Sequence, residues 1–198
     1  LCRLADPTSG VVSVAGVDLR TVDPEARRRA IRLVPQDGFL FDATLLDNIE
    51  MGCPGVSEDA VRAAVARLGL DEWLDRLPDG LRTEVGERGE QLSVGERQLV
   101  ALIRAEVGDA GLLILDEATS AVDPETERAL SEALVRLAEG RTLVSVAHRL
   151  SIAEAADHIV VFEHGRVVET GHHKDLVDAG GVYAGLYESW VGNTRDAV

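Results

Sequence analysis

The segment Leu112–Asp116 constrains the fold more than any other feature of the chain. Four consecutive aliphatic residues lead directly to acidic ones in the stretch LLILDEATSAVD, residues 112 to 123. An unbroken apolar run of this length indicates a strand that is buried on both faces, as in a parallel sheet. Ligands of α/β sheets gather at the carboxyl ends of such strands. The position of Asp116 and Glu117 at that end therefore predicts a ligand site.

Strand and helix patterns alternate along the chain, which is typical of βαβ units. Beyond Leu112–Asp116, strands are expected at residues 11–14, 31–34, 142–146, 158–162 and 166–169, the last two joined by a turn in which Gly165 takes a positive φ. Asp23-Pro24 and Asp123-Pro124 predict helix starts with a carboxylate N-cap, and Gly140 is expected to close the second of these helices. A further helix is expected over residues 57–69, and residues 40–107 contain no convincing strand.

Composition limits the classes of function. The chain has 198 residues, about the length of one larger domain, and its aliphatic runs are far shorter than a membrane span. The net charge is −15, from 35 acidic and 20 basic residues. Because such a surface repels phosphate backbones, binding of nucleic acid by broad electrostatics is excluded.

A second group of polar residues lies in LSVGERQL, residues 92–99. Ser93 and Glu96 have the spacing of a capping box, which predicts a helix start at this point. The same arrangement can serve as an anion site, because backbone N–H groups at a helix N-terminus attract negative charge. Taken alone, this pattern is also explained by a helix cap without any ligand. Asp116 and Glu117, taken alone, can likewise be explained as solvated acids.

Four motifs in a fixed order give a more specific result. They are LVPQDGFLFDATLLDNIEMG, TEVGERGEQLSVGERQL, LLILDEATSAVDPET and LVSVAHRLS. Together they resemble the nucleotide-binding domain of an ATP-binding cassette (ABC) transporter of exporter type, over nearly the whole chain. The resemblance implies an α/β, P-loop NTPase-like fold with a parallel core sheet and an inserted helical subdomain. Residues 1–198 would form one ATP-binding domain, with residues 1–38 and 108–198 as the ATPase core and about 39–107 as the helical signature subdomain.

The resemblance also implies residue roles around ATP and Mg²⁺. Glu117 matches the catalytic base and His148 the switch histidine that senses the γ-phosphate. Asp116 matches the Walker B aspartate that supports Mg²⁺. Gln36 matches the Q-loop glutamine, which contacts Mg²⁺ and relays the nucleotide state to the membrane domain. Asp123 matches the D-loop acid at the interface between two such domains.

The signature loop is implied at four consecutive positions, Ser93, Val94, Gly95 and Glu96, where it would contact ATP held by a second nucleotide-binding domain. Val94 and Glu96 depart from the commonest form of this loop, which has glycine and glutamine there. Glu96 places an acid near a triphosphate, although an acid also suits a helix N-terminus. Glu106, further along the same helix, replaces a residue that is usually smaller or apolar and is expected to disturb packing if it is buried.

A P-loop is not found in these residues, since the only lysine, Lys174, lies in HHKDL near the other end of the chain. Leu1 and Leu4 are spaced like the last turn of a helix that Asp6-Pro7 would end, and no helix start precedes them. We therefore expect an N-terminal truncation with the P-loop upstream, so that the fragment alone is inactive as an ATPase.

The function predicted from these features is that of the ATP-hydrolysing motor domain of an ABC exporter. Its expected partners are a second nucleotide-binding domain and a transmembrane domain, the latter contacted through Gln36 and the loop from Thr83 to Gly89. The expected location is the cytoplasmic face of the cell membrane. Two alternatives remain, a soluble ABC-family ATPase and a degenerate cassette without a P-loop that acts as a binding or regulatory module.

Overall fold

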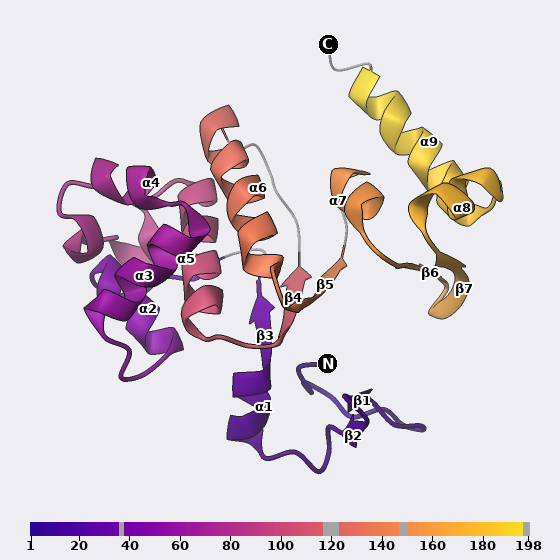
Figure 1. Ribbon diagram of the computed structural model, residues 1–198, viewed down its shortest axis with the longest axis horizontal. Helices are drawn as coiled ribbons and strands as arrows, with labels where there is room; N and C mark the ends of the chain where they lie inside the picture. The colour runs from indigo at the N-terminus through magenta and orange to yellow at the C-terminus, as the bar shows by residue number, and fades with distance from the viewer. Residues whose placement is uncertain (36–37, 117–122, 147–149, 196–198) are drawn as a thin grey trace. The chain divides into compact units, whose positions relative to one another are not determined.

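The computed structural model describes residues 1–35, 38–116, 123–146 and 150–195 (Figure 1). The chain divides into two compact units, residues 1–144 and 145–198, and the division falls within one strand. Within the described residues, every helix is too short or too polar to cross a membrane.

The first unit begins with a short hairpin and continues as alternating helices and strands. Its elements are β1 (Ser13–Val14), β2 (Val17–Asp18), α1 (Pro24–Ala30), β3 (Ile31–Val34), α2 (Leu45–Gly52), α3 (Glu58–Leu68), α4 (Asp71–Arg76), the 3-10 turns η1 (Gly80–Arg82) and η2 (Glu87–Gly89), α5 (Val94–Val107), β4 (Leu112–Asp116), α6 (Pro124–Ala138) and the start of β5 (Thr142–Val146). This element order confirms the predicted α/β class, with helices in the middle of the chain.

A parallel strand pair is the centre of this unit. β3 and β4 run parallel with Ile31 opposite Leu112, and the strand order is β3-β4-β5. Leu113 and Leu115 are buried in the main core, and Leu112 packs on the other side with Leu19 and Ile31. The prediction that β4 is covered on both faces is therefore correct over most of its length.

One part of the second sheet face is more open. Leu33 lies opposite Ile114 in the parallel register, so both side chains point to the same face as Ile31 and Leu112. Leu33 is 39% exposed, and Ile114 is only partly buried. This open part lies toward the carboxyl ends of the two strands.

The helical segment packs around α5, which contacts α2, α3, α6 and β3 (Figure 1). The helix expected over residues 57–69 is α3, with Ser57 as its N-cap and Gly69 in the left-handed conformation at its end. Its buried side chains are Val61, Ala64, Val65 and Leu68, as the apolar spacing predicts.

The two Asp-Pro helix starts are confirmed. Asp23 accepts hydrogen bonds from the backbone N–H groups of Glu25 and Ala26, and Asp123 accepts one from Thr126. Gly140 follows the end of α6 with a φ of 71°. The helical turn expected at Leu1 and Leu4 is wrong, because residues 1–12 contain no helix.

The second unit comprises the end of β5 followed by α7 (Leu150–Ala155), β6 (Ile159–Glu163), β7 (Arg166–Gly171), α8 (His173–Asp178) and α9 (Val182–Arg195). The predicted hairpin is present, with β6 and β7 antiparallel and Gly165 at a φ of 75° in the turn. Glu169 accepts hydrogen bonds from the backbone N–H groups of Val182 and Tyr183, at 2.7 and 2.9 Å. This carboxylate thus caps the start of α9.

Candidate nucleotide site

The N-terminus of α5 has the capping box that the sequence predicts. The Ser93 hydroxyl accepts a hydrogen bond from the Glu96 backbone N–H at 3.2 Å, and Glu96 Oε2 accepts one from the Ser93 N–H at 2.8 Å. Ser93 and Val94 are exposed, whereas Gly95 is buried. The loop therefore presents its first residues to solvent at the positive end of a helix of 14 residues, where an anion is favoured.

The second oxygen of the Glu96 carboxylate is also engaged. Glu96 Oε1 accepts a hydrogen bond from the indole Nε1–H of Trp73 at 3.1 Å. Trp73 belongs to α4 and is only 3% exposed. Its part in this group was not found from the sequence, because no motif or regular spacing connects positions 73 and 96.

The acids of the opening motif occupy different positions. Asp116 is exposed at the end of β4, and it has no hydrogen-bond or ion-pair partner among the described residues. Asp123 is the N-cap of α6, where the hydrogen bond from the Thr126 backbone N–H lowers the pKa of its carboxyl below the usual value. Asp116 is thus available to a ligand, while Asp123 already has a local structural role.

Three predicted site residues, Gln36, Glu117 and His148, lie outside the described residues. The structure brings Ser93 and Glu96 together by hydrogen bonds, and α5 packs against α6, which Asp123 opens. It records no direct bond between Asp116 and the Ser93–Glu96 loop.

The Thr83–Gly89 loop, which is expected to contact a membrane domain, is hydrogen-bonded to the segment before α2. The N–H of Leu45 donates to the carbonyl of Thr83 at 2.9 Å, and the N–H of Val85 donates to that of Ala43 at 3.1 Å. Phe39 and Phe41, just before this junction, are about half exposed and make an edge-to-face pair with ring centroids 5.0 Å apart. Because Ala43 is hydrogen-bonded to Val85, the two exposed aromatic rings lie near the start of the Thr83–Gly89 loop.

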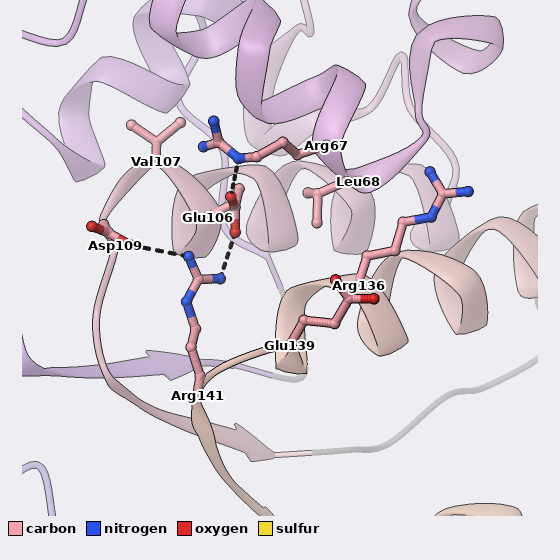
Figure 2. Close-up of a pocket in the computed structure, with 8 residues that line it drawn as sticks. All are labelled: Arg67, Leu68, Glu106, Val107, Asp109, Arg136, Glu139 and Arg141. Carbon is pink, nitrogen blue, oxygen red and sulfur yellow. Dashed lines mark hydrogen bonds and ion pairs between the residues drawn. The ribbon is translucent and has the colours of Figure 1, made fainter.

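The carboxylate of the buried Glu106 forms ion pairs with two arginines. Its two carboxylate oxygens pair with Arg67 of α3 and with Arg141 just before β5, each at 2.5 Å. Arg141 also bonds to Asp109 at 3.2 Å (Figure 2). Burial raises the pKa of the Glu106 carboxyl, but the hydrogen bonds from Arg141 and Arg67 outweigh it, and the net pKa is lowered. The expected disturbance of packing is thus replaced by an ion-pair network.

This network lines a pocket of about 530 Å³, whose lining residues are Arg67, Leu68, Glu106, Val107, Asp109, Arg136, Glu139 and Arg141 (Figure 2). Asp109 precedes β4, whereas Asp116 ends it. The pocket therefore lies at the opposite end of β4 from the predicted nucleotide site, and it contributes none of the residues predicted to bind ATP.

The α/β architecture, with a parallel sheet and packed helices, matches the P-loop NTPase-like fold of a solved ABC exporter domain. The solved structure of a bacterial Atm1-family ABC exporter with ATP bound is similar to the chain, with a TM-score of 0.86 and 40% sequence identity. That similarity covers 96% of this chain and 33% of the exporter chain.

Residues 1–120 match the family model described as ABC transporter, and the chain therefore belongs to the ABC transporter family as an ATP-binding domain. It is 49% identical to the mycobactin import ATP-binding/permease protein IrtB of Mycolicibacterium thermoresistibile over 93% of this chain and 32% of that protein. It is 46% identical to the ATP-dependent lipid A-core flippase of Ralstonia nicotianae over 94% of this chain and 32% of that protein.

A third relative is the uncharacterized ABC transporter ATP-binding protein YknV of Bacillus subtilis, with 41% identity over 96% of this chain and 31% of that protein. The chain thus spans about a third of the length of these three relatives. Nucleotide-binding domains of this family bind ATP and couple its hydrolysis to transport, and those of ABC exporters pair with transmembrane domains and dimerise.

Proposed function

We propose that this chain is the part of an exporter-type ABC transporter that binds and hydrolyses ATP and thereby drives transport across a membrane. The observation that carries the proposal is the capped, solvent-facing N-terminus of α5 at Ser93–Glu96, in a domain similar to an ATP-bound exporter. Residues 1–198 all belong to this domain, with about 39–107 as its helical signature subdomain.

In this proposal the Ser93–Glu96 loop contacts the γ-phosphate of ATP that a second nucleotide-binding domain holds. The exposed Ser93 hydroxyl and the backbone N–H groups at the start of α5 suit a phosphate chemically. Asp116, exposed and without a partner among the described residues, suits a hard cation that prefers oxygen ligands, and Gln36 completes this Mg²⁺ site. Bound Mg²⁺ supplies charge neutralisation on the phosphate oxygens.

The chemical step is attack of water on the γ-phosphorus, which breaks the bond to the β-phosphate oxygen and gives ADP and inorganic phosphate. Glu117 accepts a proton from the attacking water and orients it, and His148 holds the γ-phosphate in position. Asp123 places the start of α6 at the interface between the two domains. Catalysis of this kind depends on positioning and charge stabilisation more than on covalent chemistry.

Coupling to transport uses Gln36 and the Thr83–Gly89 loop. The hydrogen bonds that join residues 43–45 to residues 83–85 hold the two segments side by side, and the exposed Phe39 and Phe41 supply an apolar contact surface beside them. We assign this surface to a transmembrane domain, at the cytoplasmic face of the membrane. Because relatives with different named cargoes are similarly identical to this chain, we assign cargo selection to the transmembrane part.

The decisive experiment compares Glu117→Gln with wild type in the full-length protein. We expect ATP turnover to fall at least about a hundredfold, because the base that activates water is lost, while ATP still drives formation of the closed dimer. Glu132→Gln is the matched control, since Glu132 is an exposed residue of α6 whose ion-pair partner among the described residues is Arg128.

Three results are informative. Undiminished turnover in Glu117→Gln would remove Glu117 from its role. A wild-type protein that binds ATP without hydrolysing it would favour the binding or regulatory module instead. ATP turnover by a full-length protein that does not enter membranes would favour the soluble ATPase.

A further inference from the structure

Glu96 is held by two donors from different parts of the chain. The Ser93 N–H, on the same loop, donates to Oε2, and the indole N–H of Trp73, on α4, donates to Oε1. Trp73 is buried in the main core together with Leu70 and Leu74, so its ring has little freedom to move. A buried indole N–H needs an acceptor, and this carboxylate oxygen supplies it.

This arrangement distinguishes a carboxylate from an amide at position 96. A carboxylate offers an acceptor on each of its two oxygens, whereas a glutamine offers one acceptor oxygen and one donor NH₂ group. With glutamine at this position, either the Ser93 N–H or the Trp73 N–H loses its partner. The structure therefore gives a physical reason for glutamate at this point of the signature loop.

The same two hydrogen bonds also bear on the charge repulsion expected between the Glu96 carboxylate and a triphosphate. Both oxygens of Glu96 accept from protein donors, and the carboxylate lies at the positive end of α5. Protein donors thus stabilise this carboxylate before any nucleotide arrives.

We propose that Trp73 is a positioning residue for the ATP-contacting loop. Trp73 fixes the Glu96 carboxylate through the hydrogen bond that the Trp73 indole N–H donates to Glu96 Oε1. This inference rests on the proposed function, because it concerns the loop that would contact ATP. Trp73 does not touch nucleotide in this scheme. It sets the conformation in which Ser93, Val94 and Gly95 meet the phosphate.

A double-mutant cycle in the full-length protein tests the proposal. Trp73→Phe keeps the aromatic ring but removes the N–H donor. We expect it to raise the ATP concentration for half-maximal turnover about fivefold to tenfold, within the usual net worth of one hydrogen bond. The maximal rate should change by less than about twofold, because Glu117 is untouched.

The second half of the cycle adds Trp73→Phe to Glu96→Met, which removes both acceptor oxygens at this position. The double variant should match Glu96→Met alone, because the indole acts only through the carboxylate. An equal rise in both backgrounds would mean that Trp73 acts by packing alone and would overturn the proposal, as would an unchanged ATP requirement in Trp73→Phe. Trp190→Phe in α9 is the matched control and should leave the ATP requirement unchanged.

A measurement that does not depend on turnover completes the test. With ¹⁵N-labelled tryptophan, the indole N–H resonance of Trp73 should move upfield in Glu96→Met, which leaves it without an acceptor at this position, and that of Trp190 should not move. An unmoved Trp73 signal would overturn the proposal even if Trp73→Phe failed to fold. If wild type does not hydrolyse ATP but the Trp73 signal moves, the positioning bond holds and it is the proposed function that fails.

Discussion

Glu106 is a carboxylate in the interior of the first unit, and its two arginine partners differ in exposure. The Arg141 side chain is 13% exposed and that of Arg67 is 59% exposed. The sequence singled out Glu106 as an unusual acid on an apolar helix but could not identify its partners, which lie 39 and 35 residues away along the chain. Long-range pairing of this kind depends on how helices pack, which local patterns do not encode.

Removing the Glu106 carboxylate should lower the stability of the folded protein. We expect Glu106→Ala to lower the free energy of unfolding by about 3 kcal/mol, because it leaves the guanidinium of Arg141 buried without its main partner. The measurement is urea denaturation of the protein. Glu132→Ala, which breaks the exposed pair with Arg128, should cost less than about 0.5 kcal/mol. Equal losses in the two variants would contradict a special role for the buried network.

The same network should weaken in acid. The folded-state pKa of Glu106 is lowered from the ordinary value of 4.5, so the pair contributes fully above that value and loses its contribution as the pH falls through the lower folded-state pKa. The stability difference between wild type and Glu106→Gln should therefore shrink between pH ~6 and pH ~3. A difference that stayed constant on acidification would show that the charge of Glu106 is not the stabilising feature.

At the scale of elements, the segment before α2 is held by side chains rather than by regular structure. Asn48, fully buried, accepts from the Phe41 N–H at 2.8 Å and donates to the carbonyls of Phe41 and Thr44. Arg104 of α5 donates to the carbonyls of Phe39 and Asn48. Side chains of α2 and α5 thus hold the backbone of the exposed aromatic pair, and α5 is also the helix that begins at the Ser93–Glu96 loop.

Replacing Asn48 should loosen this support selectively. In Asn48→Ala the Phe41 N–H loses its acceptor, so its amide hydrogen should exchange at least about tenfold faster, and unfolding should be easier by about 2 kcal/mol. Hydrogen exchange followed by mass spectrometry or NMR measures the effect. Protection at Leu99, in the middle of α5, should change only in proportion to global stability. Unaltered exchange at Phe41 would show that Asn48 does not hold the segment.

A close approach at Gly38 gives a second element-level prediction. A Cβ at this position would lie 2.6 Å from the carbonyl oxygen of Arg97 on α5, so Gly38→Ala must push the segment away from the helix. We expect a loss of about 2 kcal/mol in unfolding free energy. Gly111→Ala, where nothing lies within 4 Å of the added carbon, is the matched control and should be close to neutral. A neutral Gly38→Ala would contradict the tight contact.

Local chemistry explains which elements were predictable. The helices that begin at Asp23, Ser57, Ser93 and Asp123 carry their caps within three residues, so the sequence alone identifies their starts. β2 was missed because its two residues, Val17 and Asp18, give no periodic signal. The helical turn expected at Leu1 and Leu4 was wrong because its signal is not specific. Two apolar residues at helical spacing also fit many conformations that are not helical. The roles of Gln36, Glu117 and His148 stay predictions from the family motifs.

At the scale of the whole molecule, charge matters for the proposed pairing of two domains. Each copy of these 198 residues carries a net charge of −15, so two copies repel each other over distances comparable with the Debye length. We expect ATP-driven association of Glu117→Gln nucleotide-binding domains that carry a P-loop to strengthen when salt is raised from ~0.02 M to ~0.2 M. Light scattering or analytical ultracentrifugation measures this. Association that weakened with salt would indicate that complementary charges at the contact outweigh the general repulsion.

The open part of the sheet face at Leu33 and Ile114 has a practical consequence. Apolar strand surface that meets water tends to recruit other apolar surface. A laboratory preparation of these 198 residues by themselves should therefore stain with hydrophobic dyes and precipitate on concentration, and a polar replacement such as Leu33→Thr should extend its shelf life. Expression trials, more than assays of activity, are where this strip of the sheet would first be noticed.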